Sequence, residues 1–154
     1  MLLAYRLVRL IETHSDELAA GLLEKLRQCP QTCSYGDVPA EEFRQRVQET
    51  YQHLGEWLLG KTESDIERRY VEIGARRCGQ GVQFSQLVCA LSLVKEHLIE
   101  FLKREAIVDK PVEVLGELEV LQLLEQFFDR AVYYAALGYE RAYVARAATA
   151  VHHK

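Results

Sequence analysis

The C-terminal quarter of the chain limits the possible folds more than any other part. Residues 112–151 contain no proline, and their apolar residues recur at steps of three and four, which is the spacing of one face of an α-helix. Gly116 and Gly138 are the two positions at which this helix could break. The whole chain of 154 residues has only three prolines and nine glycines, so it has little material for turns. We therefore predict an all-α fold with a long C-terminal helix.

Four earlier segments show the same helical period. The first is either one helix or a short helix followed by a longer one that starts near Ser15, where two acidic residues follow. Gly60 suits the end of the second helix, and Thr62 or Ser64 suits the start of the third. No β alternation, internal repeat or linker is visible, so we predict a single domain of about five to seven helices. The predicted segments are residues 2–28, 37–60, 62–79 and 84–104 within a domain of residues 1–154.

Charge and hydropathy exclude several classes of protein. The net charge of −4 argues against a nucleic-acid-binding protein, which usually has a basic surplus. Arginines do cluster in residues 68–77, but acidic residues alternate with them, as on a solvated helix face rich in ion pairs. No stretch of about 18 residues is free of charge, so no membrane-spanning helix is predicted. The N-terminus has no signal-peptide pattern, and we expect a cytoplasmic protein.

Motifs for catalysis or metal binding are absent from the sequence. The four cysteines, which we expect to be reduced, are Cys29, Cys33, Cys78 and Cys89. Cys29 and Cys33 could hold a metal only if two further ligands converged on them, and no second pair has metal-ligand spacing. No nucleophile elbow, P-loop or dinucleotide-binding motif is present. We expect no metal and no enzyme.

The segment Gly74–Gly81 contains a charged residue in an unusual place. Arg77 falls where the helical pattern of Ile66, Tyr70 and Ile73 points inward. An inward arginine is either paired within the core or forms the floor of a pocket. Both interpretations remain open at this stage.

The last helix carries a row of small residues every three or four positions. Such a row lets a second helix approach closely, either in the core of the domain or in the contact between two copies. The residues that we select as candidates for a dimer contact are Ala131, Ala135, Gly138 and Ala142.

An all-α chain of this size could hold a haem, and a histidine would then be the iron ligand. His97 lies beside Leu93 and Phe101 at the edge of the apolar face of its helix, and it is the haem-ligand candidate if there is one. His53 shares a side of its helix with Arg46 and Thr50, and we predict that His53 is exposed.

The stretch YVEIGARRCGQGVQFSQLVCALSLVKEHLIEFL, residues 70–102, resembles the RsbR-type (RsbRD) N-terminal domain family. These are non-haem, globin-fold sensor domains of bacterial stress-signalling proteins, and a weaker resemblance extends over about residues 2–145. Haem-bearing sensor globins share the pattern G-x-x-H-x-x-x-G, in which the iron-binding histidine corresponds to Arg77. A guanidinium stays protonated and does not bind iron in the normal way.

The resemblance implies a globin-like helical bundle that has lost its haem ligand and needs no cofactor. If a pocket persists, Arg77 could bind an anionic head group, and related sensors suggest an apolar ligand such as a fatty acid. The pocket candidates are Arg77, Tyr70, Ile73 and Leu91.

We therefore expect a haem-free sensory or protein-interaction module of bacterial signalling. It would act with a signalling partner and form a homodimer through its N- and C-terminal helices. The family usually continues into an output domain, so a chain that ends at Lys154 would be a free-standing relative or an excised module. Two alternatives remain: a haem-binding sensor that uses His97, and a purely structural dimeric scaffold without a ligand.

Overall fold

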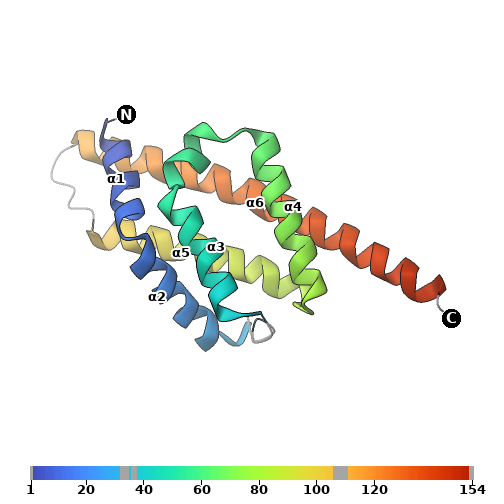
Figure 1. Ribbon diagram of the computed structural model, residues 1–154. Coiled ribbons are helices and arrows are strands. Elements are labelled where there is room, and N and C mark those ends of the chain that lie inside the picture. The colour runs from blue at the N-terminus through green and yellow to red at the C-terminus, as the bar shows by residue number, and fades with distance from the viewer. Residues whose placement is uncertain (1, 32–34, 36–37, 106–110, 153–154) are drawn as a thin grey trace.

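The chain folds into helices alone throughout the part that the structure describes. The computed structural model describes residues 2–31, 35, 38–105 and 111–152 (Figure 1). The predicted all-α fold and the long last helix are both confirmed. The helices are α1 (Leu2–Thr13), α2 (Ser15–Gln28), α3 (Ala40–Gln52), the π-helical turn η2 (Glu56–Gly60), α4 (Glu63–Gly79), α5 (Phe84–Glu105) and α6 (Pro111–His152).

Helix starts follow local backbone chemistry. The predicted alternative of two N-terminal helices is correct, but Ser15 is the buried first residue of α2, and His14 precedes it without a side-chain cap. Of the two predicted starts of α4, Thr62 is the cap. Its hydroxyl accepts a hydrogen bond from the Asp65 backbone N–H at 3.2 Å, and the Asp65 carboxylate accepts one from the Thr62 N–H at 3.0 Å. This reciprocal pair satisfies two N–H groups that a helix start would leave unpaired.

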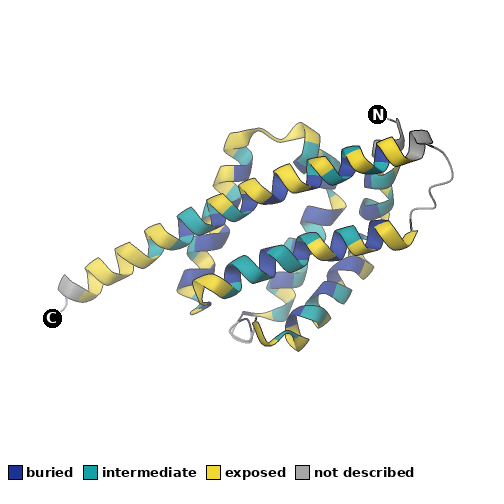
Figure 2. Cartoon of the chain, turned by 180° about the vertical axis from the view of Figure 1, so that it is seen from behind, coloured by how far each residue is buried: buried dark blue, intermediate teal, exposed yellow. Residues whose placement is uncertain are grey.

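The helices form two layers. Figures 1 and 2 agree that α5 and α6 lie on one side and that α1, α2, α3 and α4 cover them from the other. Tyr51 joins the layers, because its buried hydroxyl donates a hydrogen bond from α3 to the Val94 carbonyl of α5 at 3.0 Å.

Helix α6 is continuous over its whole length. Neither Gly116 nor Gly138 interrupts it, so the breaks considered at these positions do not occur. Its C-terminal end projects beyond the other helices (Figure 1), and residues 143–150 are all exposed. Residues 106–110, between α5 and α6, lie outside the described part of the chain.

The backbones of α4 and α6 touch where the two helices cross. A Cβ atom added to Gly74 would lie 1.9 Å from the Ala135 carbonyl oxygen, and one added to Gly138 would lie 2.1 Å from the Val71 carbonyl oxygen. Both glycines are therefore required by space, since real Cβ atoms essentially never come within 3.0 Å of another heavy atom.

The row of small residues lies largely in this crossing. Ala131 and Ala135 are fully buried, and Gly138 contacts α4 of the same chain. These three positions serve core packing, so they are not available to a second copy. Ala142, the fourth dimer candidate, is half-buried one turn farther on.

Gly74→Ala is expected to lower the free energy of unfolding by about 2–4 kcal/mol, because the new methyl group would force α4 away from α6. Urea denaturation followed by circular dichroism measures the change. Gly79→Ala is the matched control: an added Cβ there meets nothing within 4 Å, so stability should stay the same or rise slightly. A Gly74 variant as stable as the parent would contradict the close crossing.

Candidate functional site

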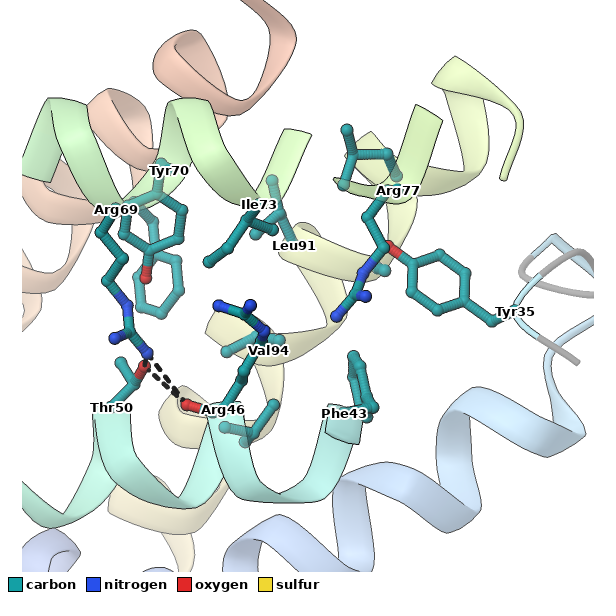
Figure 3. A pocket seen from close by; sticks show the side chains of 14 residues that line it. Tyr35, Phe43, Arg46, Thr50, Arg69, Tyr70, Ile73, Arg77, Leu91 and Val94 are labelled. Atoms are coloured by element: carbon teal, nitrogen blue, oxygen red, sulfur yellow. Dashed lines mark hydrogen bonds between the residues drawn. The ribbon is translucent and has the colours of Figure 1, made fainter. Parts of the chain in front are cut away.

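A cavity of about 50 Å³ lies between α3, α4 and α5 (Figure 3). All four residues predicted as pocket candidates line it, so the structure brings Arg77, Tyr70, Ile73 and Leu91 together. The remaining apolar lining comes from Phe43, Val47, Leu87, Ala90, Val94 and Phe128, and the remaining polar lining from Tyr35, Arg46, Thr50 and Arg69.

Each helix contributes one face to this lining. On α4, the lining residues Tyr70, Ile73 and Arg77 are three and then four positions apart. On α5, Leu87, Leu91 and Val94 are four and then three positions apart. Residues at these intervals lie on the same side of an α-helix. The amphipathic pattern that builds the core therefore also builds the wall of the cavity.

Arg77 is paired within the protein. Its side chain is only 3% exposed, and its Nη1 donates hydrogen bonds to Glu42 Oε1 at 3.0 Å and to Gln80 Oε1 at 2.7 Å. The guanidinium also lies 5.7 Å from the centre of the Tyr35 ring, within the range of a cation–π interaction. Of the two interpretations of Arg77, the paired core arginine is the one that this geometry supports.

Glu42 is the acid at the centre of the network. Arg76 donates two hydrogen bonds to its carboxylate, one of them to Oε2 at 3.0 Å, and Arg77 donates another. The hydrogen bonds from Arg76 lower the pKa of Glu42 to about 2 against the opposing effect of burial, and Arg77 adds to the shift. The carboxylate is therefore charged at neutral pH and balances the buried Arg77.

Tyr35 covers the outer side of Arg77. Burial raises the pKa of Tyr35 to about 12, although the nearby positive charge of Arg77 opposes the shift. The phenol is neutral at physiological pH, so it adds an aromatic wall and no second negative charge.

Arg69 occupies the opposite end of the cavity. Its Nη2 donates hydrogen bonds to Thr50 Oγ1 at 2.8 Å and to the Arg46 carbonyl at 3.2 Å, and it forms an ion pair with Glu49 at 2.7 Å. Its guanidinium lies 4.8 Å from the centre of the Trp57 ring. Its Nε is buried and has no hydrogen-bond partner in the described part of the chain.

Arg46 reaches from α3 toward the middle of the cavity, between Arg69 and Arg77 (Figure 3). Its ion pairs are long, at 3.9 Å to Glu42 and 3.6 Å to Glu72. Both distances exceed hydrogen-bond length. Among the three arginines of the cavity, Arg46 is thus the one held least tightly by the protein's own acids.

His53, which is predicted to be exposed, lies at the end of α3 with its side chain 45% exposed. Thr50 is only 5% exposed, and it lines the cavity together with Arg46, whereas His53 does not line it. A signal for the buried position of Thr50 was available in the spacing, because Thr50 follows the apolar Val47 by three residues.

The mouth between α3 and α4 is bridged by ion pairs. In order along α3, Glu42 pairs with Arg76 and Arg77, Arg46 with Glu72, and Glu49 with Arg69. Pairs between flexible and partly exposed side chains contribute little stability and are screened by salt. This applies to the Arg46–Glu72 and Arg69–Glu49 pairs, whose acids are 68% and 44% exposed, and not to the buried Arg77–Glu42 pair. The two helices can therefore separate more easily at the Arg69 end of the mouth than at the Arg77 end.

His97 lies away from the cavity. It is 8% exposed, and its ring packs so closely on Gly21 of α2 that an added Cβ there would be 3.4 Å away. Burial and then the charge of Lys25 lower its pKa. Among the described residues, neither ring nitrogen of His97 has a partner with hydrogen-bond geometry. The backbone of Leu18 is nearby and raises the pKa of His97, which partly offsets the lowering. The haem-ligand candidate and the Arg77 cavity are separate places, and a cavity of about 50 Å³ does not fit a porphyrin.

Comparison with known families identifies the chain. The family model described as the RsbT co-antagonist protein rsbRD N-terminal domain matches residues 12–152, nearly the whole chain. The chain belongs to this family. No curated protein and no solved structure matches it. The match confirms the family predicted from residues 70–102. The RsbRD N-terminal domain is a sensor-type domain of stress signalling.

Neither a membrane-spanning helix nor a metal site is present among the residues of the RsbRD domain that the structure describes. No helix there is long and apolar enough to cross a membrane. In residues 2–31, 35, 38–105 and 111–152, no group of three or more histidine, cysteine, aspartate or glutamate side chains could hold a metal. Cys33, one of the two cysteines considered as metal ligands, lies outside the described residues.

Glu42→Gln is expected to lower the free energy of unfolding by about 2–3 kcal/mol at pH 7, because Arg77 would stay buried without its anionic partner. The pKa of Glu42 is lowered from 4.5 to about 2 in the folded protein. Its stabilising effect is therefore complete above pH 4.5 and is lost as the pH falls toward 2. The difference between parent and variant, measured by urea denaturation at several pH values, should narrow over that range.

Glu41→Gln is the control for this comparison. Glu41 is the neighbouring residue, exposed and paired with Arg44 outside the cavity, so its substitution should change stability little. A loss in Glu42→Gln that stays constant between pH 7 and pH 3 would contradict the ionic role of Glu42.

Proposed function

We propose that this RsbRD domain is a haem-free, non-enzymatic, globin-like sensory module that binds a small apolar anion and passes the signal to a signalling partner through α6. The observation that carries the proposal is the cavity between α3, α4 and α5, which combines an apolar floor with Arg46 at its centre. Family membership supports the sensory role.

The charges around the cavity favour an anionic ligand. Arg77 and Arg69 are held by short hydrogen bonds within the protein, but Arg46 has only the two long ion pairs. A ligand carboxylate could accept hydrogen bonds from the Arg46 guanidinium in a bidentate geometry. The acid-binding role first suggested for Arg77 is thus better assigned to Arg46.

The volume of the cavity limits the size of the ligand. About 50 Å³ is well below the roughly 150 Å³ of an engineered cavity that takes benzene. A short monocarboxylate suits the cavity as it stands. A long-chain fatty acid would require α3 and α4 to separate along their ion-paired mouth.

Helix α4 offers a direct route from the cavity to α6. Tyr70, Ile73 and Arg77 on one side of α4 line the cavity, while Gly74 on the other side touches the backbone of α6. Packed backbones have no compressible side chains between them, so a shift of α4 moves α6 as well. This coupling would carry the ligand signal toward the end of α6.

The two alternatives fit these observations less well. A haem-binding sensor would need a histidine at the cavity, whereas Arg77 stands there and His97 packs against α2. A ligand-free structural scaffold would be expected to fill its core, and the arginine-lined cavity is not explained by that role.

The smallest monocarboxylates, such as acetate, are expected to raise the melting temperature of the parent by about 4 °C at ten times the dissociation constant, and acetamide, which lacks the charge, should not. Thermal-shift measurements test this. Arg46→Gln should abolish the rise, whereas Arg44→Gln, on the same helix but paired with Asp16 and Glu41 outside the cavity, should keep it. No stabilisation by any acid, or the same stabilisation in Arg46→Gln, would refute the ligand proposal.

Self-association through the terminal helices is the second part of the proposal. The N-terminal half of α6 exposes Val114, Leu115 and Leu118. Tyr5 of α1 and Leu59 of η2 are also exposed, and they line a groove that α6 borders through Leu123. Apolar side chains that gather on one surface indicate an interaction site, and a second copy would bury them.

Light scattering at high micromolar concentration is expected to give the mass of a dimer, and Leu115→Glu combined with Leu118→Glu should give a monomer. Tyr143→Glu, at an exposed position far along α6, is the control and should leave the dimer intact. A parent protein that is strictly monomeric at that concentration would refute dimerisation.

A further inference from the structure

Two cysteines from different helices meet at one point beside the cavity. Cys29 ends α2, and Cys89 lies in α5. Each thiol hydrogen-bonds the same atom, Gln31 Oε1, at 3.7 Å. The two sulfurs are therefore no farther apart than twice that distance.

The pKa of Cys89 also reflects the nearness of the Cys29 thiol. Burial raises the pKa of the Cys89 thiol, and Cys29 raises it further through its charge and through a side-chain hydrogen bond. Such an effect requires the sulfurs to be neighbours. The pair thus has short-range contact in the reduced state.

Both cysteines can be reached from solvent. Cys29 and Cys89 are partly exposed, whereas Cys78 is buried. A small oxidant can approach the first two without the domain opening, and it cannot approach the third. Accessibility therefore separates this pair from Cys78.

We propose that Cys29 and Cys89 form an oxidative modification site, at which a hydroperoxide converts the two thiols into a disulfide between α2 and α5. Formation of this disulfide does not require that a carboxylate binds in the cavity.

The reaction balances with one hydroperoxide per pair. The Cys29 thiolate attacks the O–O bond, which breaks to give a sulfenic acid on Cys29 and an alcohol, or water when the oxidant is hydrogen peroxide. The Cys89 thiolate then attacks that sulfur, the S–S bond forms, and the sulfenic oxygen leaves as water. Two electrons pass from the sulfurs to the peroxide, and the two thiol protons end in the alcohol and the water.

The raised pKa of Cys89 bears on the order of the two steps. A thiol that holds its proton more tightly is the poorer first nucleophile at neutral pH. This favours Cys89 as the thiol that resolves the sulfenic acid. The reaction should be faster at higher pH.

The disulfide would act on the wall of the cavity. Ala90 and Leu91, which follow Cys89, line it, and so does Tyr35, which packs on Arg77. A covalent link at this place would fix the end of α2 to α5 beside those residues.

The test uses the double variant Cys33→Ser/Cys78→Ser, in which only the proposed pair remains. Treatment with tert-butyl hydroperoxide is expected to remove both thiols together and to lower the monomer mass by about 2 Da, for the two hydrogens lost. Dithiothreitol should restore both thiols. The control, which also carries Cys89→Ser, should show no such disulfide within the monomer.

Two results would overturn the proposal. One is stepwise oxidation of the single sulfurs to sulfinic acid, and the other is formation of disulfides only between separate chains. The parent protein gives an independent measurement, because trypsin places Cys29 and Cys33 in residues 28–44 and Cys78 and Cys89 in residues 78–95. Oxidised parent should yield these two peptides joined, and a bridge confined to residues 28–44 would refute the pairing.

Discussion

The direct contact between the backbones of α4 and α6 is the constraint on which the other features depend. Gly74 and Gly138 leave no side chain between the helices. The backbone of α4 therefore lies directly against the backbone of α6, and the distance between the two helices is fixed. The opposite face of α4 is thereby set at a definite distance from α3 and α5. That distance leaves room for long polar side chains and a small cavity.

The buried Arg77 follows from this placement and has a cost. Removing a guanidinium from water is unfavourable unless hydrogen bonds and an opposite charge replace the water. Glu42, Gln80 and the Tyr35 ring supply these replacements. Such a network adds little net stability compared with apolar packing. Its hydrogen bonds are all formed in one arrangement only, because moving any one of these side chains leaves its partners without a hydrogen bond. The network thus fixes α3 relative to the end of α4.

Local chemistry explains which features could be predicted from the sequence. The helices, the Thr62 cap and the inward direction of Arg77 depend on neighbours within one or two turns, so the sequence pattern contains them. The partner of Arg77 could not be predicted in the same way, since Glu42 comes from another helix. Arg46 could not be identified as a cavity residue because a long polar residue beside an apolar stripe looks like a surface residue unless a second helix is known to face it. The meeting of Cys29 and Cys89 likewise depends on how α2 and α5 pack, which no local spacing records.

The free end of α6 turns small movements into larger ones. From the crossing at Gly138 to the last turn near His152, the helix extends about 20 Å at a rise of about 1.5 Å per residue. A rigid rod of that length is a lever with its fulcrum at the glycine contact, and a tilt of about 5° displaces its tip by about 2 Å. Residues 143–150 are exposed, and Arg146 ties this part of α6 to the end of α4 through a hydrogen bond to the Cys78 carbonyl at 3.1 Å. Beyond Arg146, the exposed last turn adds little packing that would resist the displacement. A helix that packed against this end of α6 would be displaced with it, and the angle between the two helices would change.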